Sequence, residues 1–211
     1  MIHLEHICYR TQERVIFEAF NLDVKAKERL VVLGPSGVGK STLLRLIAGF
    51  TKAQKGKIIL DGKRASIDDT IIIPPAKRSI GMLFQERALW PHFNVFENID
   101  FGLKLKKIPF DKRQETIAHI LHSVGLEGYE KRDISTLSGG EQQRVALARA
   151  LVLEPKIMLM DEPLSSLENQ RRQSLVHTIL ELQEAIGFTL LYVTHSTHEA
   201  QAIATKVLEL S

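Results

Sequence analysis

The chain has 211 residues, 44% of them hydrophobic and 25% charged, which indicates a globular protein with one sizeable core or a core carrying an inserted lobe. The net charge is only +3, despite a pI of about 9.0, and no dense block of lysine and arginine is present, so we expect no nucleic acid partner. A single cysteine, Cys8, rules out an internal disulfide, and neither a signal peptide pattern nor an uninterrupted apolar run of about 18 residues occurs.

The first part of the chain reads as β-structure followed by a strand, a loop and a helix. Residues 2–9 and 15–24 alternate short apolar runs with polar residues, as antiparallel strands with one wet face do. Residues 29–33 form a strongly apolar run typical of a buried strand, and a glycine-rich loop follows at 34–39. Further elements are predicted for a helix over 40–50 and strands over 57–60 and 79–85, with turns at Asp61-Gly62 and Pro74-Pro75.

After about residue 86 the pattern becomes helical and then returns to alternating strands and helices. We predict helices over 111–124, 141–153, 168–186 and 197–204, and strands over 157–160, 189–193 and 207–210. This order indicates an α/β fold. Its core, residues 1–85 and 155–211, would hold a mainly parallel sheet flanked by helices and an N-terminal antiparallel β subdomain. A helical lobe would be inserted at 86–154, within a single domain spanning 1–211.

A phosphate-binding loop follows the buried strand, because residues 34–41 fit the pattern G-x-x-x-x-G-K-[ST] at every fixed position. Glycines let backbone N–H groups converge on a phosphate, and the next helix adds its positive end. Lys40 would reach the β and γ oxygens, and the Ser41 hydroxyl would ligate Mg²⁺. The alternative is a chance match in a glycine-rich turn. Residues predicted to contact ATP here are Gly34, Pro35, Ser36, Gly37, Val38, Gly39, Lys40, Ser41 and Thr42.

Two adjacent acids end the apolar strand at 157–160. Because side chains alternate along a strand, Asp161 and Glu162 point in different directions and can do different work. An aspartate in this position of a P-loop ATPase serves the Mg²⁺ shell, and the neighbouring glutamate is then placed to polarise the attacking water as general base. An exposed Asp-Glu-Pro turn is the structural alternative.

The segment 137–144, Leu-Ser-Gly-Gly-Glu-Gln-Gln-Arg, resembles the signature motif of ATP-binding-cassette (ABC) proteins. Ser138, Gly139 and Gly140 precede a predicted helix, which would give a second anion-binding N-terminus. A simple capped helix start is the alternative. The resemblance implies that this signature closes on ATP held by the phosphate loop of a second copy of the chain.

Other positions follow the same family in order, and their roles are implied by the resemblance. Gln85 matches the residue that contacts Mg²⁺ and senses the γ-phosphate, and His195 matches the switch histidine. Three departures stand out. Ser166 and Glu168 replace the usual alanine and aspartate of the loop after the catalytic glutamate, Ser196 replaces a common aspartate, and Thr11 stands where an aromatic usually stacks on adenine, so we expect Tyr9 to stack instead.

The resemblance also implies partners. The aromatic segment 85–99 matches the region that receives a coupling helix of a transmembrane permease, and Leu89, Trp90 and Phe93 are expected to form that surface. The chain is similar to importers of sugars, polyamines, thiamine, oxyanions or metals, which implies a substrate-binding protein and a peripheral location on the cytoplasmic face of the plasma membrane. No regulatory domain follows within the sequence, which stops at Ser211. Alternatives are an export or lipid-extraction motor, a non-transport ABC ATPase, and an ATP-bound scaffold without turnover.

Overall fold

The structure, a computed structural model, describes residues 1–211 and contains two β-sheets. The first sheet is antiparallel with the strand order β2-β1-β4-β5-β6, and the second is parallel with the order β10-β3-β9-β8-β7. The strands of the antiparallel sheet are β1 (Ile2–Arg10), β2 (Val15–Val24), β4 (Lys55–Leu60), β5 (Lys63–Ile67) and β6 (Thr70–Ile71). Those of the parallel sheet are β3 (Arg29–Leu33), β7 (Ile80–Leu83), β8 (Ile157–Asp161), β9 (Thr189–Thr194) and β10 (Lys206–Glu209).

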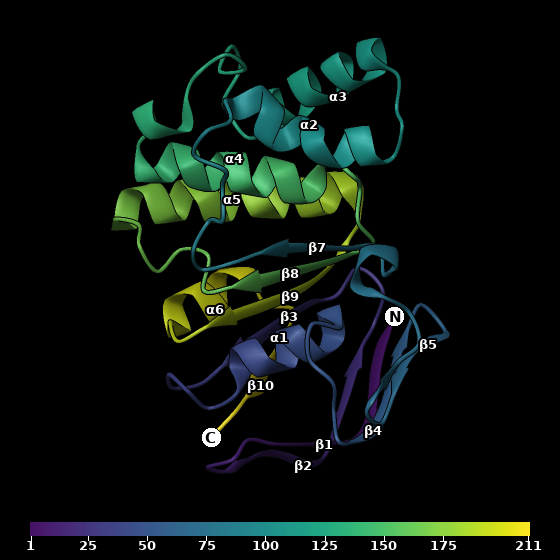
Figure 1. Cartoon of the computed structure of the whole chain (residues 1–211). Coiled ribbons are helices and arrows are strands. Elements are labelled where there is room, and N and C mark those ends of the chain that lie inside the picture. Colours follow the sequence, from purple (N-terminus) through teal and green to yellow (C-terminus); the bar gives the residue numbers. More distant parts are fainter.

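Helices cover both faces of the parallel sheet (Figure 1). The antiparallel sheet lies beside α1 at the N-terminal end of the chain, and α4 and α5 lie between the parallel sheet and the other lobe helices. No helix is long and apolar enough to cross a membrane. The helices are α1 (Lys40–Ala48), α2 (Val95–Leu105), α3 (Phe110–Ser123), α4 (Gly139–Leu151), α5 (Asn169–Ile186) and α6 (Thr197–Ile203), with short 3₁₀ turns at Pro75–Lys77 and Ile134–Thr136.

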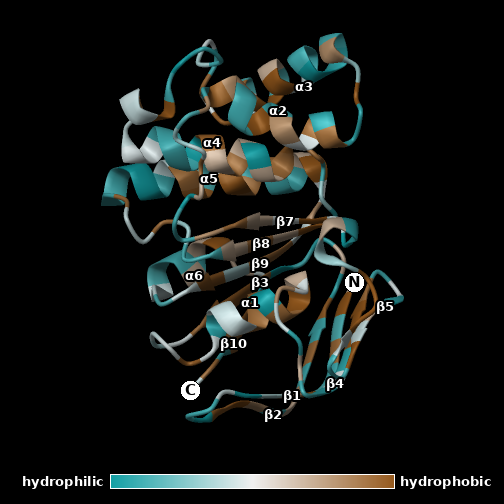
Figure 2. Cartoon of the chain, viewed as in Figure 1, coloured by the Kyte–Doolittle hydropathy of each residue, from teal (hydrophilic) through white to brown (hydrophobic).

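The parallel sheet separates two hydrophobic cores, because its strands bury side chains on both faces. Within β3, Leu30 and Val32 face the core shared with α1 and the antiparallel sheet, whereas Val31 faces the core shared with the lobe helices and α5. This alternation explains the continuous apolar runs in the sequence. Figure 2 shows the same concentration of hydrophobic residues along the central strands.

Arg78 braces α1 against the antiparallel sheet. Its guanidinium is buried and donates to the carbonyl oxygens of Leu46 (3.3 Å) and Ile47 (2.7 Å) in the last turn of α1, and to Ala65 O (3.1 Å) and Ser66 Oγ (2.7 Å) in β5. A cation at the C-terminal end of a helix also complements the helix dipole. The helix that follows the phosphate loop is therefore fixed to the N-terminal sheet.

The predicted fold class is confirmed, including the antiparallel subdomain and the inserted helices. Some elements differ from the sequence analysis. Strand β7 ends at Leu83, two residues before the predicted end, and β5 and β6 were not predicted. The helix α2 was also missed, although Asn94 and Glu97 form a capping box at its start. The aromatic density of this segment favoured its interpretation as a partner surface, and it masked the helical spacing of Val95 and Ile99, which are fully buried.

Candidate functional site

The candidate site lies where β3, β8 and β9 end, at the same edge of the parallel sheet. The registers pair Leu33 of β3 with Thr194 of β9, and Val193 of β9 with Asp161 of β8, so the three strands finish side by side. In open parallel sheets the loops at this edge hold the functional groups. The loops that start here are the glycine-rich loop 34–39, the turn at Glu162 and the turn at His195.

The glycine-rich loop adopts a conformation that only glycine permits at its critical positions. Gly37 and Gly39 have φ angles of +83° and +117°, a region that other residues rarely occupy. A Cβ on Gly39 would lie 2.5 Å from Ile16 Cγ2, and a Cβ on Gly34 would lie 2.5 Å from the carbonyl oxygen of Leu210. Helix α1 begins directly after the loop with no side chain capping its first N–H groups. The loop and helix start therefore form an N–H-lined cradle suited to an anion.

Lys40 lies inside this cradle. Its side chain is buried, and Nζ donates to the carbonyl oxygens of Gly34 (2.7 Å) and Pro35 (2.9 Å). The same Nζ lies 3.5 Å from Glu162 Oε1. The lysine charge is thus held between the loop and the acid that follows β8. Of the other predicted contact residues, Ser36 is exposed at the loop tip, while Val38 and Thr42 are half-buried.

Two of the three predicted Mg²⁺ ligands, Ser41 and Asp161, lie in hydrogen-bond contact, whereas Gln85 is not bonded to either. The Ser41 hydroxyl donates to Asp161 Oδ1 at 2.9 Å, although the two residues are 120 positions apart. Burial raises the pKa of Asp161 above its ordinary value, and the hydrogen bond from Ser41 partly opposes this effect. Two hard oxygen donors suit Mg²⁺, which normally completes its shell with water and substrate phosphates. No cluster of three or more histidine, cysteine, aspartate or glutamate side chains that could hold a metal ion is present in the chain.

Glu162 and His195 meet beside this pair. His195 Nδ1 lies 3.0 Å from Glu162 Oε2. The backbone of Glu162 has a φ of 43°, and its N–H donates to Val193 O at 3.0 Å, so the turn after β8 is fixed against β9. Strained backbone that its surroundings hold in place is frequent at functional sites. Glu162 is half-buried and His195 is exposed, which leaves both side chains accessible from the loop edge.

A buried acid supports the histidine turn. Glu199, at the start of α6, accepts hydrogen bonds from the hydroxyls of Tyr192 and Thr194, both at 2.8 Å. Its carboxylate also lies 3.5 Å from Arg172 Nε. The nearby charge and burial raise the pKa of Tyr192 well above its ordinary value, with burial the larger cause. These contacts anchor both ends of the segment that presents His195.

The signature residues lie elsewhere, at the start of α4. Ser138 caps this helix: Ser138 Oγ accepts from Glu141 N (3.4 Å), and Ser138 N donates to Glu141 Oε2 (2.7 Å). No hydrogen bond connects Ser138, Gly139 or Gly140 with the phosphate loop of the same chain. Gln85 is exposed two residues past β7, with no side-chain hydrogen bond in the structure. One chain therefore does not bring the signature and the cradle together.

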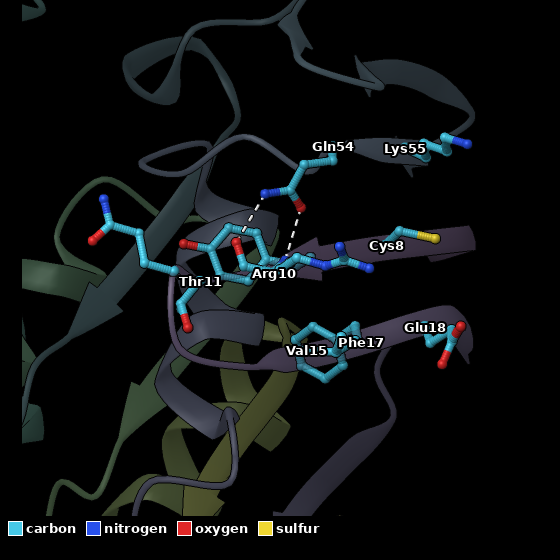
Figure 3. Close-up of a pocket in the computed structure, with 10 residues that line it drawn as sticks. Cys8, Arg10, Thr11, Val15, Phe17, Glu18, Gln54 and Lys55 are labelled. Atoms are coloured by element: carbon cyan, nitrogen blue, oxygen red, sulfur yellow. Dashed lines mark hydrogen bonds between the residues drawn. The ribbon is translucent and has the colours of Figure 1, made fainter.

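A cavity of about 610 Å³ lies beside the turn between β1 and β2, and Tyr9 and Thr11 are among its lining residues (Figure 3). Tyr9 is half-buried there. The direct contact from this turn to the phosphate loop, however, is made by Arg14, whose guanidinium donates to Gly37 O. Sequence reasoning missed Arg14, because a surface arginine in a polar turn gives no signal of such a contact.

The solved structures that resemble this chain are ABC cassettes. The dimeric bacterial ABC transporter cassette MJ0796 superposes with a TM-score of 0.86 at 30% identity, covering 100% of this chain and 94% of that one. The same cassette bound to ADP and Pi in a post-hydrolysis state gives a TM-score of 0.86 at 29% identity, with the same coverage of both chains. The fold and the phosphate-loop geometry together define a P-loop cassette of the ABC type.

The chain belongs to the ABC transporter family, whose profile matches residues 17–165. Among curated proteins it is similar to the spermidine/putrescine import ATP-binding protein PotA of Clostridioides difficile, with 42% identity over 99% of this chain. PotA of Acetivibrio thermocellus is 44% identical over 100% of this chain. The chain spans 58% of the length of each of these two relatives.

Proposed function

We propose that this chain is the motor subunit of an ABC importer, in which two copies enclose two ATP molecules between them. The observation that carries the proposal is the separation of two half-sites: the cradle at 34–41 on the parallel sheet, and the signature 138–140 on α4, with no hydrogen bond between them within a chain. Each half would be completed by the other copy. The dimeric state of a cassette that resembles this chain over its whole length supports this arrangement.

Within each site, the residues have separate roles. The cradle N–H groups and Lys40 bind the triphosphate, and Ser41 and Asp161 hold Mg²⁺ together with Gln85. Glu162 orients and deprotonates the attacking water, while His195, 3.0 Å away, fixes the glutamate and contacts the γ-phosphate. Ser138, Gly139 and Gly140 of the second copy close over the same phosphate, and Tyr9 lies beside the adenine.

The partners we propose are two transmembrane permease subunits, with a substrate-binding protein outside the membrane and this chain on the cytoplasmic face. Aromatic side chains that follow Gln85 support the docking surface. The Trp90 ring lies 5.8 Å from Phe93 and 4.8 Å from Phe101, between ring centroids, and Phe101 is 42% exposed. Trp90 and Phe93 are half-buried, so the cluster is partly exposed, and such a surface fits an apolar helix of a partner. The import of polyamines by similar proteins supports an organic cation as substrate class.

The central test replaces Glu162 by glutamine. The variant keeps the shape of the site but loses the base, so ATP hydrolysis should fall by about a hundredfold or more, while ATP binding persists. Size exclusion with MgATP should then reveal a trapped dimer. The matched control is Glu154→Gln, an exposed carboxylate outside the site, which should leave turnover unchanged. Wild-type turnover in Glu162→Gln would remove Glu162 as the base.

The membrane role has a separate test. Replacing Trp90 and Phe93 by serine should leave the ATPase activity of the isolated chain intact but abolish stimulation by the permease subunits. Copurification of the native complex identifies those subunits. Recovery of a substrate-binding protein in that complex supports import, whereas a permease with no such protein and outward transport would point to an exporter.

A further inference from the structure

The segment after Gln85 is bound to helix α4 by one arginine. Arg149 donates from Nη1 to Ala88 O (2.8 Å) and from Nη2 to Arg87 O (3.0 Å). Its guanidinium also stacks over the Trp90 ring, 5.0 Å from the ring centroid. Arg149 thereby joins α4 to the backbone of residues 87–88 and to the Trp90 side chain. Because one guanidinium makes both contacts, a movement of the backbone at Arg87 is coupled to the position of the Trp90 ring.

A second arginine connects the same segment to the loop after Glu162. Arg87 Nη2 donates to Ser166 Oγ at 3.0 Å, and Nη1 contacts Gln142 Oε1 at 3.5 Å. The guanidinium also covers the first turn of α4, since a Cβ on Gly139 would lie 3.1 Å from Nη2. Arg87 therefore contacts residues from two places: the loop at 165–168, and the first turn of α4, which includes the signature residue Gly139.

The hydrogen bonds that the Arg87 guanidinium donates to Ser166 and Gln142 are weak enough to break and re-form. Both acceptors are neutral, a hydroxyl and an amide, and the buried Arg87 Nε has no hydrogen-bond partner. Hydrogen bonds to neutral acceptors are weaker than those to a carboxylate. Arg113 in the same lobe differs, because it is buried against the carboxylate of Asp100. Ser166 is exposed, so a displacement of its loop can release Arg87.

We propose that Arg87 and Arg149 are positioning residues that transmit ATP-driven closure from the 165–168 loop to Trp90 and the docking surface. This inference rests on the proposed function, since closure is the event that moves the 165–168 loop. The Ser166 hydroxyl stands where the family has alanine, and it provides the acceptor on which the link depends. A second copy that presses on this loop shifts Ser166 and releases the Arg87 guanidinium, and Arg149, which is bonded to Arg87 O and Ala88 O, carries the change to the Trp90 ring.

The chain contains one tryptophan, so Trp90 emission reports on the end point of this relay directly. The experiment uses the full chain carrying Glu162→Gln, and measures the change in emission on addition of MgATP. Size exclusion on the same samples reports dimer formation. Further substitutions in this background are Arg87→Met, Ser166→Ala and Ser166→Thr. The matched control is Arg132→Met, which removes a lobe guanidinium that stacks on Tyr129 outside the relay.

MgATP should change the emission of the parent variant and of the Arg132→Met control. Arg87→Met and Ser166→Ala should still form the dimer but lose most of that change, and Ser166→Thr, which keeps the hydroxyl, should restore it. The double variant Arg87→Met/Ser166→Ala should lose no more of the emission change than either single variant, because both substitutions remove the Arg87–Ser166 hydrogen bond. A full emission change in dimeric Arg87→Met overturns the relay, and so does failure of both single variants to dimerise. If the parent itself does not dimerise, the proposed function fails first.

Discussion

Substitution of Glu141 tests which hydrogen bonds stabilise the signature turn at the start of α4. Its Oε2 accepts from Ser138 N at 2.7 Å, and its Oε1 accepts from the Tyr129 hydroxyl at 2.8 Å. These hydrogen bonds, first from Ser138 and then from Tyr129, lower the pKa of Glu141 from 4.5 to about 2. Glu141→Gln keeps the shape of the side chain but removes the charge that both donors stabilise.

The size of the effect follows from that shift. One pKa unit corresponds to about 1.4 kcal/mol, so a fall from 4.5 to about 2 would represent about 3 kcal/mol if the carboxylate were fully shielded. Glu141 is half-exposed, and solvent screening reduces the contribution to about 1–2 kcal/mol. We expect Glu141→Gln to lower the free energy of unfolding by that amount at neutral pH.

Urea unfolding of both proteins across a pH series measures this difference. The pKa of the carboxyl is depressed in the folded protein, so its contribution is complete above about pH 4.5 and disappears as the pH falls to about 2. The difference in the free energy of unfolding between wild type and Glu141→Gln should therefore become smaller below about pH 4.5. Glu127→Gln, an exposed lobe carboxylate that contacts only His122, is the control and should have little effect. If the difference in the free energy of unfolding stays constant from neutral pH to about pH 2, the Glu141 carboxylate does not stabilise the signature turn in this way.

Three further predictions concern the core and the cradle. Arg78→Met removes the buried donor of Ile47 O and Ile73 O, which have no other hydrogen-bond partner, and should lower the free energy of unfolding in urea by about 3 kcal/mol. Burial raises the pKa of Asp161, and Mg²⁺ binds the ionised carboxylate. The affinity for MgATP, measured by fluorescence titration, should therefore begin to fall at a higher pH than an ordinary aspartate would give. If Asp161→Asn shows the same dependence of MgATP affinity on pH as the wild type, the prediction is wrong. Gly39→Ala, with its Cβ 2.5 Å from Ile16, should abolish MgATP binding with little change in circular dichroism, and retained binding would contradict the steric argument.

The elements that sequence could predict are those whose signal lies within a few residues. The runs at 29–33 and 157–160 are apolar at every or nearly every position because the strands are buried on both faces. Strand β5 carries no such run, since Ala65 and Ser66 are its buried side chains, and it was missed. Helix α2 had both a capping box and helical spacing, but its aromatic residues pointed to a different interpretation.

The parts of the candidate site that could be predicted are the polar residues at or just after the ends of apolar strands. Ser41 and Asp161 meet although they lie 120 residues apart, because both follow strands that end at the same sheet edge. The arginine contacts were not predictable. Arg87 reaches Ser166 across 79 residues, and no local pattern specifies where a long side chain extends. The contributions of Gln85, Tyr9 and the signature glycines to nucleotide binding remain predictions, since in the proposed dimer their ligand would be shared with a second copy.

The position of β7 at the margin of the parallel sheet has a mechanical consequence. Strand β8, which ends in Asp161, is hydrogen-bonded along both sides, to β7 up to Met160 and to β9 up to Asp161, so displacing this strand would break hydrogen bonds to two neighbours. Strand β7 is bonded along one side only, and the chain leaves it toward Gln85 and the lobe. A rotation of the helical lobe at the end of β7 would therefore break few hydrogen bonds. The carboxylates of Asp161 and Glu162 therefore lie at the end of a strand that is held on both sides, whereas the connection to the lobe leaves from the edge strand.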